Sequence, residues 1–97
     1  MDDSDDELQI QVDRHPDREE LERRGVFLWE VWSKGVSVFP WTYDDREVCY
    51  LLEGEAEVTP AGGEPVSIGA GDLVTFPRGL SCTWEVRRPV RKHYDVG

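Results

Sequence analysis

Two segments of this chain place glycine, proline and one acidic residue at spacings that favour short strands joined by tight turns. The first segment contains, in order, Gly35, Trp41, Tyr43, Glu47 and Gly54. The second contains Gly71, Pro77, Gly79, Cys82 and Val86. Glycine accepts backbone conformations that other residues avoid, and proline fixes one backbone angle. The two segments therefore predict strands that meet at sharp corners, and they constrain the fold more than any other feature.

Apolar or alternating stretches of strand length fill the rest of the chain. An alternating stretch at 8–12 predicts a first strand, and Pro16 opens a predicted helix at 17–24, with acidic residues early and arginines late. The strands predicted after this helix are 26–32, 36–43, 47–52, 55–59, 66–68, 73–76, 81–86 and 90–94. Turns are expected at 53–55, 60–65 and 87–89. Regularly spaced short strands of this kind are typical of a β-barrel or jelly roll.

Length and charge limit the organisation of the chain and its partners. At 97 residues we expect a single domain at 8–97, preceded by a disordered acidic leader at 1–7. The formal net charge of -10 argues against nucleic acid or an anionic membrane as partner. No apolar run is long enough to span a membrane, and the leader has no apolar region typical of a secretory signal. A cytoplasmic protein with free Cys49 and Cys82 thiols is expected.

The two motifs resemble the signature motifs of the cupin superfamily, Gly-x5-His-x-His-x3-Glu-x6-Gly and Gly-x5-Pro-x-Gly-x2-His-x3-Asn. Similarity to the small one-domain cupins grouped with ureidoglycine aminohydrolase extends over nearly the whole chain after the leader, to the tail at 90–94. The resemblance implies an all-β, double-stranded β-helix (jelly-roll) barrel with one short N-terminal helix. It also implies a metal site, but Trp41, Tyr43 and Cys82 stand in the histidine positions.

The side chains in the metal-ligand positions argue against a metal. The indole of Trp41 cannot bind one, and Tyr43 could do so only as a phenolate, whose formation has a reference pKa near 10. Glu47 and Cys82 can act as ligands, but they are fewer than the three or four that zinc or iron requires. We therefore expect no metal cofactor. An atypical metal bound by Tyr43, Glu47 and Cys82 is the alternative.

In a cupin barrel these positions are expected to point into one cavity. Trp41, Tyr43 and Trp84 would form an aromatic wall of this cavity. Glu47 and Cys82 would be the polar side chains within it. A pocket for a small molecule and a core filled by its own aromatic residues are both compatible with this pattern. A nucleophilic role for Cys82 is disfavoured, because the expected neighbour Glu47 carries the wrong charge to stabilise a thiolate.

Two other groups of residues have more than one interpretation. His15 is assigned to the helix entry, whereas His93 could reach either the cavity or a subunit contact. A basic cluster near the C-terminus is interpreted as a solvated end of the sheet, with an anion site as the alternative. It consists of Arg87, Arg88, Arg91 and Lys92.

The function favoured by the sequence is a small-molecule-binding cupin with a degenerate metal site and no assigned reaction. The alternative is an aminohydrolase-, isomerase- or lyase-like enzyme for a small polar metabolite, with Glu47 as acid/base and Tyr43 or Cys82 assisting. A third possibility is a dimerising module without a ligand. A homodimer is expected in any case, paired through the exposed edge of the strand at 8–12.

Overall fold

The structure is a computed structural model that describes residues 9–97, so the expected leader lies outside the described residues. Strands dominate this part of the chain, with one short helix and one 3-10 turn near its start. The elements are β1 (Gln11–Arg14), α2 (Arg18–Arg23), η1 (Val26–Leu28), β2 (Glu30–Lys34), β3 (Ser37–Thr42), β4 (Glu47–Pro60), β5 (Val66–Gly69), β6 (Asp72–Phe76) and β7 (Ser81–Val96).

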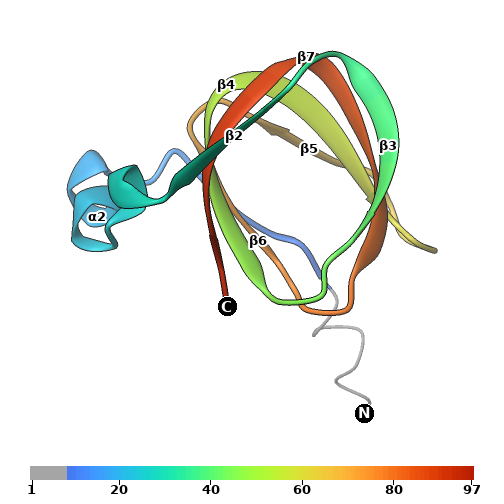
Figure 1. The fold of residues 1–97 in the computed structure, drawn as a ribbon, viewed down its shortest axis with the longest axis horizontal. Coiled ribbons are helices and arrows are strands. Elements are labelled where there is room, and N and C mark those ends of the chain that lie inside the picture. The colour runs from blue at the N-terminus through green and yellow to red at the C-terminus, as the bar shows by residue number, and fades with distance from the viewer. Residues whose placement is uncertain (1–8) are drawn as a thin grey trace.

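All seven strands belong to one antiparallel sheet that curls into a barrel (Figure 1). The strand order is β1-β6-β4-β7-β2, with β3 beside β7 and β5 beside β4. Both β2 and β3 pair with β7, β2 along its second half and β3 along its first. Helix α2 lies outside the barrel wall (Figure 1). The all-β barrel with one short helix, predicted from the spacing of strands and turns, is confirmed.

Strands β4 and β7 are longer than expected. We predicted that the chain reverses at 53–55 and breaks again at 87–89, but each segment continues as one strand. The register between them shifts between Leu51 and Ala56, and Gly54 has a φ of 96°. An irregularity of this kind bends a strand and changes which residues face inward without reversing its direction. The glycine therefore marks a bulge here, although its sequence context resembled a hairpin turn.

Gly54 is required at this bulge for two reasons. Its positive φ is strained for any residue with a Cβ atom. A Cβ atom here would also collide with the backbone carbonyl of Pro89 on β7, so the two strands approach too closely for any side chain. Pro89 fits the opposite position because it has no backbone N–H that must be satisfied in the ladder.

The first third of the chain differs from expectation in its boundaries. β1 begins three residues later than predicted and pairs with β6, where Arg14 also contacts Asp72 at 2.7 Å. Only the second part of the predicted strand 26–32 is extended. Its first part forms the turn η1, which buries Val26 against Leu21 beneath α2. β1 has one paired neighbour, β6, among the described residues, and the expected homodimer through it stays a prediction.

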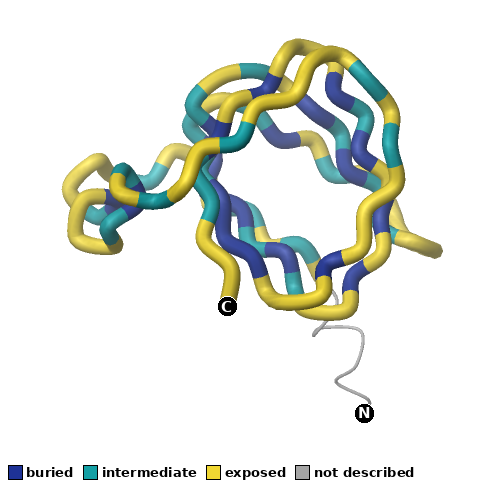
Figure 2. Tube along the Cα trace, viewed as in Figure 1, coloured by how far each residue is buried: buried dark blue, intermediate teal, exposed yellow. Residues whose placement is uncertain are grey.

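The buried side chains form two clusters. The larger one fills the interior of the barrel, and Figure 2 shows buried positions recurring along the strands that form it. The smaller one joins α2 and η1 to the outer face of the sheet and comprises Leu21, Val26, Val48 and Leu73. β4 is consequently buried on both faces near its start, because Val48 faces outward to the helix while Cys49 faces the interior. No helix of residues 9–97 has the length and hydropathy that crossing a membrane would need.

Replacing Gly54 with alanine should lower the free energy of unfolding by about 2–4 kcal/mol, because strain and overpacking act together. The matched control is Gly62→Ala. Gly62 also has a positive φ, of 72°, but has open space around its Cβ position. The Gly62→Ala substitution should lower the free energy of unfolding by about 1 kcal/mol, from strain alone. Urea denaturation compares the two variants, and equal losses would show that the β4–β7 contact imposes no steric requirement.

Candidate functional site

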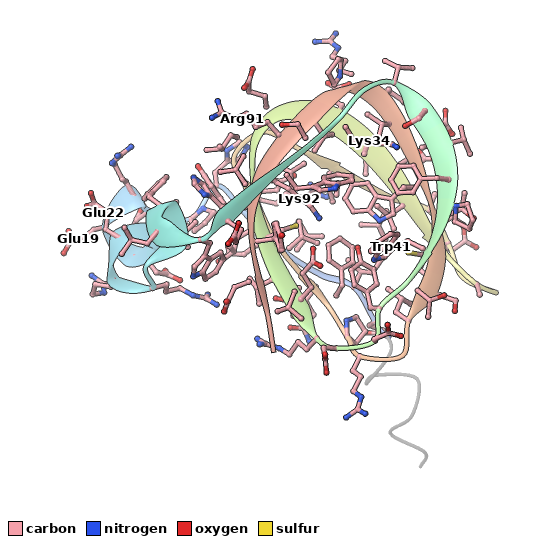
Figure 3. The ribbon with its side chains drawn as sticks, in the orientation of Figure 1. Glu19, Glu22, Lys34, Trp41, Arg91 and Lys92 are labelled. Carbon is pink, nitrogen blue, oxygen red and sulfur yellow. The ribbon has the colours of Figure 1, made fainter. Side chains whose placement is uncertain are left out.

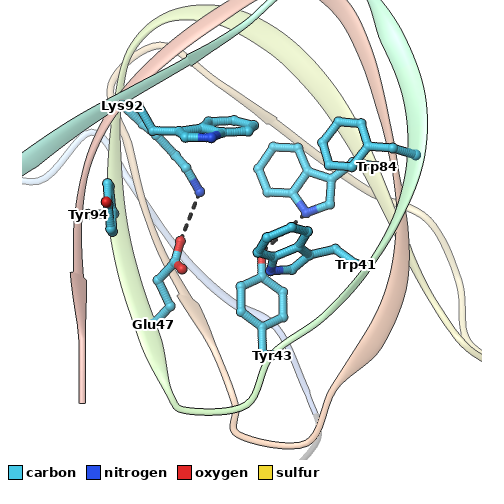
Figure 4. A pocket seen from close by; sticks show the side chains of 8 residues that line it. Trp41, Tyr43, Glu47, Trp84, Lys92 and Tyr94 are labelled. Carbon is cyan, nitrogen blue, oxygen red and sulfur yellow. Dashed lines mark hydrogen bonds and ion pairs between the residues drawn. The ribbon is translucent and has the colours of Figure 1, made fainter.

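A cavity of about 170 Å³ opens into the barrel beside β2, β3, β4 and β7. Figure 4 shows the side chains that line it pointing into one space. They are Trp32, Phe39, Trp41, Tyr43, Glu47, Trp84, Lys92 and Tyr94. Alternation along the strands explains the set, because every second residue of β3 and of β7 faces the same side of the sheet. The site therefore follows from strand register, with contributions from four strands.

The residues predicted for the site are placed as follows. Trp41, Tyr43, Glu47 and Trp84 all line the cavity. Cys82 is buried close by, with its Sγ 3.6 Å from the backbone carbonyl of Trp41, but it does not line the cavity. Trp32, Phe39, Lys92 and Tyr94 line the cavity and were not predicted. Phe39 could have been found from alternation, since it shares a face with Trp41 and Tyr43. Trp32 gives no such signal, because the residues on its face of β2 are Glu30 and Lys34.

The aromatic walls are packed against one another and fixed in place. The Trp84 indole N–H donates a hydrogen bond to the hydroxyl of Tyr43 at 3.2 Å, inside the barrel (Figure 4). Tyr43 stacks on Phe76 with ring centroids 4.7 Å apart, and Phe39 stacks on Trp84. Trp41 contacts Tyr43 edge-on but is 50% exposed, so it stands at the opening of the cavity. The walls are therefore preformed, with Trp41 positioned to contact whatever enters.

The main polar feature of the cavity is an ion pair between Lys92 and Glu47. The ammonium Nζ of Lys92 lies 2.8 Å from Oε2 of Glu47, and the two side chains are only 7% and 11% exposed. The same ammonium lies 4.9 Å from the ring of Trp84 and 5.0 Å from that of Trp32, at distances typical of cation–π contacts. Both the carboxylate and the aromatic rings thus hold the Lys92 ammonium inside the barrel.

The interpretation of Lys92 as part of a solvated basic cluster is wrong. The other three members do lie outside, where each pairs with a glutamate; Arg91, for example, contacts the exposed Glu53. In Figure 3, Lys92 points into the barrel and its neighbour Arg91 points away from it. Alternation along β7 places Lys92 on the same face as the buried Trp84 and Val90. Arg88 has the same parity but is exposed, so alternation alone does not single out Lys92, whose burial depends on its pairing with Glu47.

The donor groups do not fit a divalent metal ion. Burial, with Glu47 nearby, raises the pKa of the Tyr43 hydroxyl far above its usual value, which disfavours a phenolate ligand. Burial also raises the pKa of the Cys82 thiol to about 11 and that of Cys49 to about 12, with Lys92 partly offsetting both shifts. The Glu47 carboxylate is already paired with an ammonium ion. Within residues 9–97, no three His, Cys, Asp or Glu side chains cluster in a way that could hold a metal.

Neither histidine replaces the missing ligands. The ring Nδ1 of His93 lies 3.0 Å from the backbone carbonyl of Trp29, and the ring packs edge-on against Phe27, on the side of the sheet that faces η1. His15 lies in the turn after β1, where its backbone N–H bonds to the carbonyl of Gly71. Both imidazoles therefore lie among the contacts that hold the N-terminal segment to the sheet, outside the residues that line the cavity.

We expect Lys92→Met to lower the free energy of unfolding by about 3 kcal/mol, because it leaves the Glu47 carboxylate buried without a partner. Adding Glu47→Gln to this variant should recover part of the loss, since the double variant buries no unpaired charge. Arg91→Met is the control on the same strand, and breaking its exposed pair should cost less than about 1 kcal/mol. Urea denaturation of the set checks this. A Lys92→Met loss no larger than that of Arg91→Met would contradict it.

We also expect purified protein to contain far less than about one zinc, iron, manganese or nickel ion per chain, because an indole, a phenol and a thiol replace the motif imidazoles and the remaining carboxylate is paired with Lys92. Mass-spectrometric elemental analysis after dialysis checks this. Stoichiometric metal that disappears in Glu47→Gln would instead assign Glu47 as a ligand.

Comparisons with known proteins agree with this architecture. A DUF861 family protein from Thermotoga maritima has 47% sequence identity, covers 92% of this chain and 100% of its own, and superposes with a TM-score of 0.89. A Salmonella typhimurium protein described as ethanolamine utilization protein Q has 32% identity over 68% of this chain, with a TM-score of 0.62. The EutQ protein of Clostridium difficile has 24% identity and a TM-score of 0.62, which supports the fold alone.

The matches differ in how much of each protein they cover. The chain spans about half the length of the two EutQ structures, 53% and 52%. No curated protein sequence matches the chain. The family model of the EutQ-like cupin domain matches residues 21–94, which include every residue that lines the cavity. On this match and on the similarity to the Thermotoga maritima structure, the chain belongs to the EutQ-like cupin domain family of the cupin superfamily.

Proposed function

We propose that this protein binds a small planar molecule in its aromatic cavity and needs no metal ion to do so. The observation that carries the proposal is the cavity itself, with about 170 Å³ of space between walls that are aromatic except for one ion pair. An apolar concavity with a few convergent polar groups is the usual form of a small-ligand site. A cavity of about 150 Å³ in another protein admits benzene. The ligand expected here is thus one ring with few substituents.

A core filled by its own side chains is the less favoured interpretation. Protein interiors are ordinarily packed with few voids larger than a water molecule. Here six aromatic side chains surround open space, and Trp41 remains half exposed at its opening. An aromatic residue that is left accessible next to a preformed cavity is better suited to contacting a ligand than to closing a core.

A second candidate function is catalysis, and the Glu47–Lys92 pair favours it. The pair provides a carboxylate that can accept a proton beside an ammonium that can donate one. An aminohydrolase, isomerase or lyase acting on a small metabolite would use Glu47 as acid/base, in keeping with the resemblance to the ureidoglycine aminohydrolase cupins. Tyr43 would assist as a neutral hydrogen-bonding group. The raised pKa of Cys82 argues against a thiolate role.

The four tryptophans of the chain allow a direct test of binding. Trp32, Trp41 and Trp84 line the cavity, whereas Trp29 lies outside it and serves as an internal control. We expect some members of a library of single-ring molecules to shift the indole N–H resonances of the three cavity tryptophans in a ¹⁵N–¹H spectrum. The Trp29 resonance should stay in place. A library that moves no cavity tryptophan, or moves Trp29 alone, would refute the proposed binding site.

A further inference from the structure

The Lys92 ammonium has hydrogen-bonding capacity that its neighbours do not use. An ammonium group carries three N–H donors. Among the described residues, one hydrogen bond from Nζ reaches a side chain, to Oε2 of Glu47. The other contacts of Nζ are with the faces of Trp32, Trp84 and Phe76, at 4.9–5.9 Å. Oε1 of Glu47 likewise has no side-chain partner within residues 9–97. The pair therefore presents a free donor and a free acceptor.

The Glu47–Lys92 pair lies at the position where the first motif has its glutamate. Glu47 occupies the glutamate position of the first motif, the one acidic residue kept where the histidines are replaced. The positive charge next to its carboxylate is the ammonium of Lys92, carried into the barrel by β7 (Figure 4). The cavity consequently has a fixed cation of its own, because the ammonium belongs to a side chain of the protein and packs between aromatic rings. A polar group that enters the cavity meets both members of the pair.

From these observations we propose that Lys92 and Glu47 together recognise the polar edge of a neutral, planar ligand that carries adjacent acceptor and donor atoms, such as a carboxamide or ring amide. The ligand oxygen accepts a hydrogen bond from Lys92, and the ligand N–H donates to Oε1 of Glu47. This inference rests on the proposed function, because it names the chemical class of the molecule bound in the same cavity.

Charge balance selects a neutral ligand. Glu47 and Lys92 are the two charged side chains among the residues that line the cavity, and they neutralise each other. An anionic ligand would bring a second negative charge beside Glu47, and a cationic one a second positive charge beside Lys92. Either ion would also lose its hydration on entering an aromatic cavity. An amide satisfies both free positions without adding charge.

The rings around the pair favour a flat ligand and keep the donor inside the cavity. Lys92 Nζ is held over Trp32 and Trp84, so the ammonium cannot move out toward solvent without losing the cation–π contacts. A planar ring attached to the amide would pack against the aromatic walls and expel water from the cavity, which strengthens the hydrogen bonds at the polar edge.

Three molecules of nearly identical shape test the proposal. Benzamide is neutral with an acceptor and a donor, benzoate is an anionic acceptor, and benzamidine is a cationic donor. We expect the wild-type protein to bind benzamide at least about tenfold more tightly than either ion, measured by calorimetry and by the shifts of the cavity tryptophans at neutral pH. Tighter binding of benzoate would overturn the proposal and make Lys92 an anion anchor. Tighter binding of benzamidine, or equal affinities, would also overturn it.

Variants separate this inference from the proposed function. In the Glu47→Gln/Lys92→Met protein, the preference for benzamide over benzoate and benzamidine should fall to about threefold or less, whereas Arg91→Met should keep the wild-type preference. Binding of all three molecules without any preference in the wild type would contradict the inference and leave the cavity as a binding site. If none of them shifts a cavity tryptophan, and the wider library also fails, both the inference and the proposed function are wrong. The wild-type comparison stands even if the double variant does not fold.

Discussion

The long antiparallel pairing of β4 with β7 is the constraint on which the rest of the structure depends. It joins the two halves of the barrel, and β2, β3, β5 and β6 all attach to one of these two strands. The bulge at Gly54 changes the inward face of β4. Cys49 and Leu51 face inward before the bulge, and Ala56 and Val58 face inward after it. The close approach at Pro89 makes this arrangement possible only without a side chain at Gly54.

The same pairing places the chemistry of the site. Glu47 at the start of β4 and Lys92 near the end of β7 both face the interior, so their charged groups meet within the barrel. The outer surface, in contrast, is acidic, because the chain carries a formal net charge of -10. Arg88 and Arg91 pair there with exposed glutamates. The interior pair is net neutral and is enclosed by aromatic rings. A neutral site inside an acidic protein suits an uncharged ligand.

The fold was more predictable from the sequence than the site. Glycine and proline act through local backbone geometry, so their spacing was enough to indicate the barrel. Alternation placed Trp41 and Tyr43 on one face, and the resemblance to a cupin barrel added Trp84. Strand length was mispredicted, because a bulge and a hairpin use the same residue types around Gly54 and only the partner strand decides between them. Lys92 was missed because its local neighbours are basic, whereas its burial depends on Glu47, 45 positions away. Long-range pairing is not visible in local composition.

The central claim is that the ion pair of Lys92 with Glu47 takes the place of a metal ion and recognises a neutral polar edge. A crystal structure of the protein grown with benzamide tests it most directly. We predict the ring within the aromatic walls, the carbonyl oxygen within hydrogen-bonding distance of Lys92 Nζ, and the amide nitrogen directed at Glu47. A ring in the cavity with its amide turned to solvent at Trp41, or a metal ion bound to Glu47 with Lys92 displaced, would contradict the account.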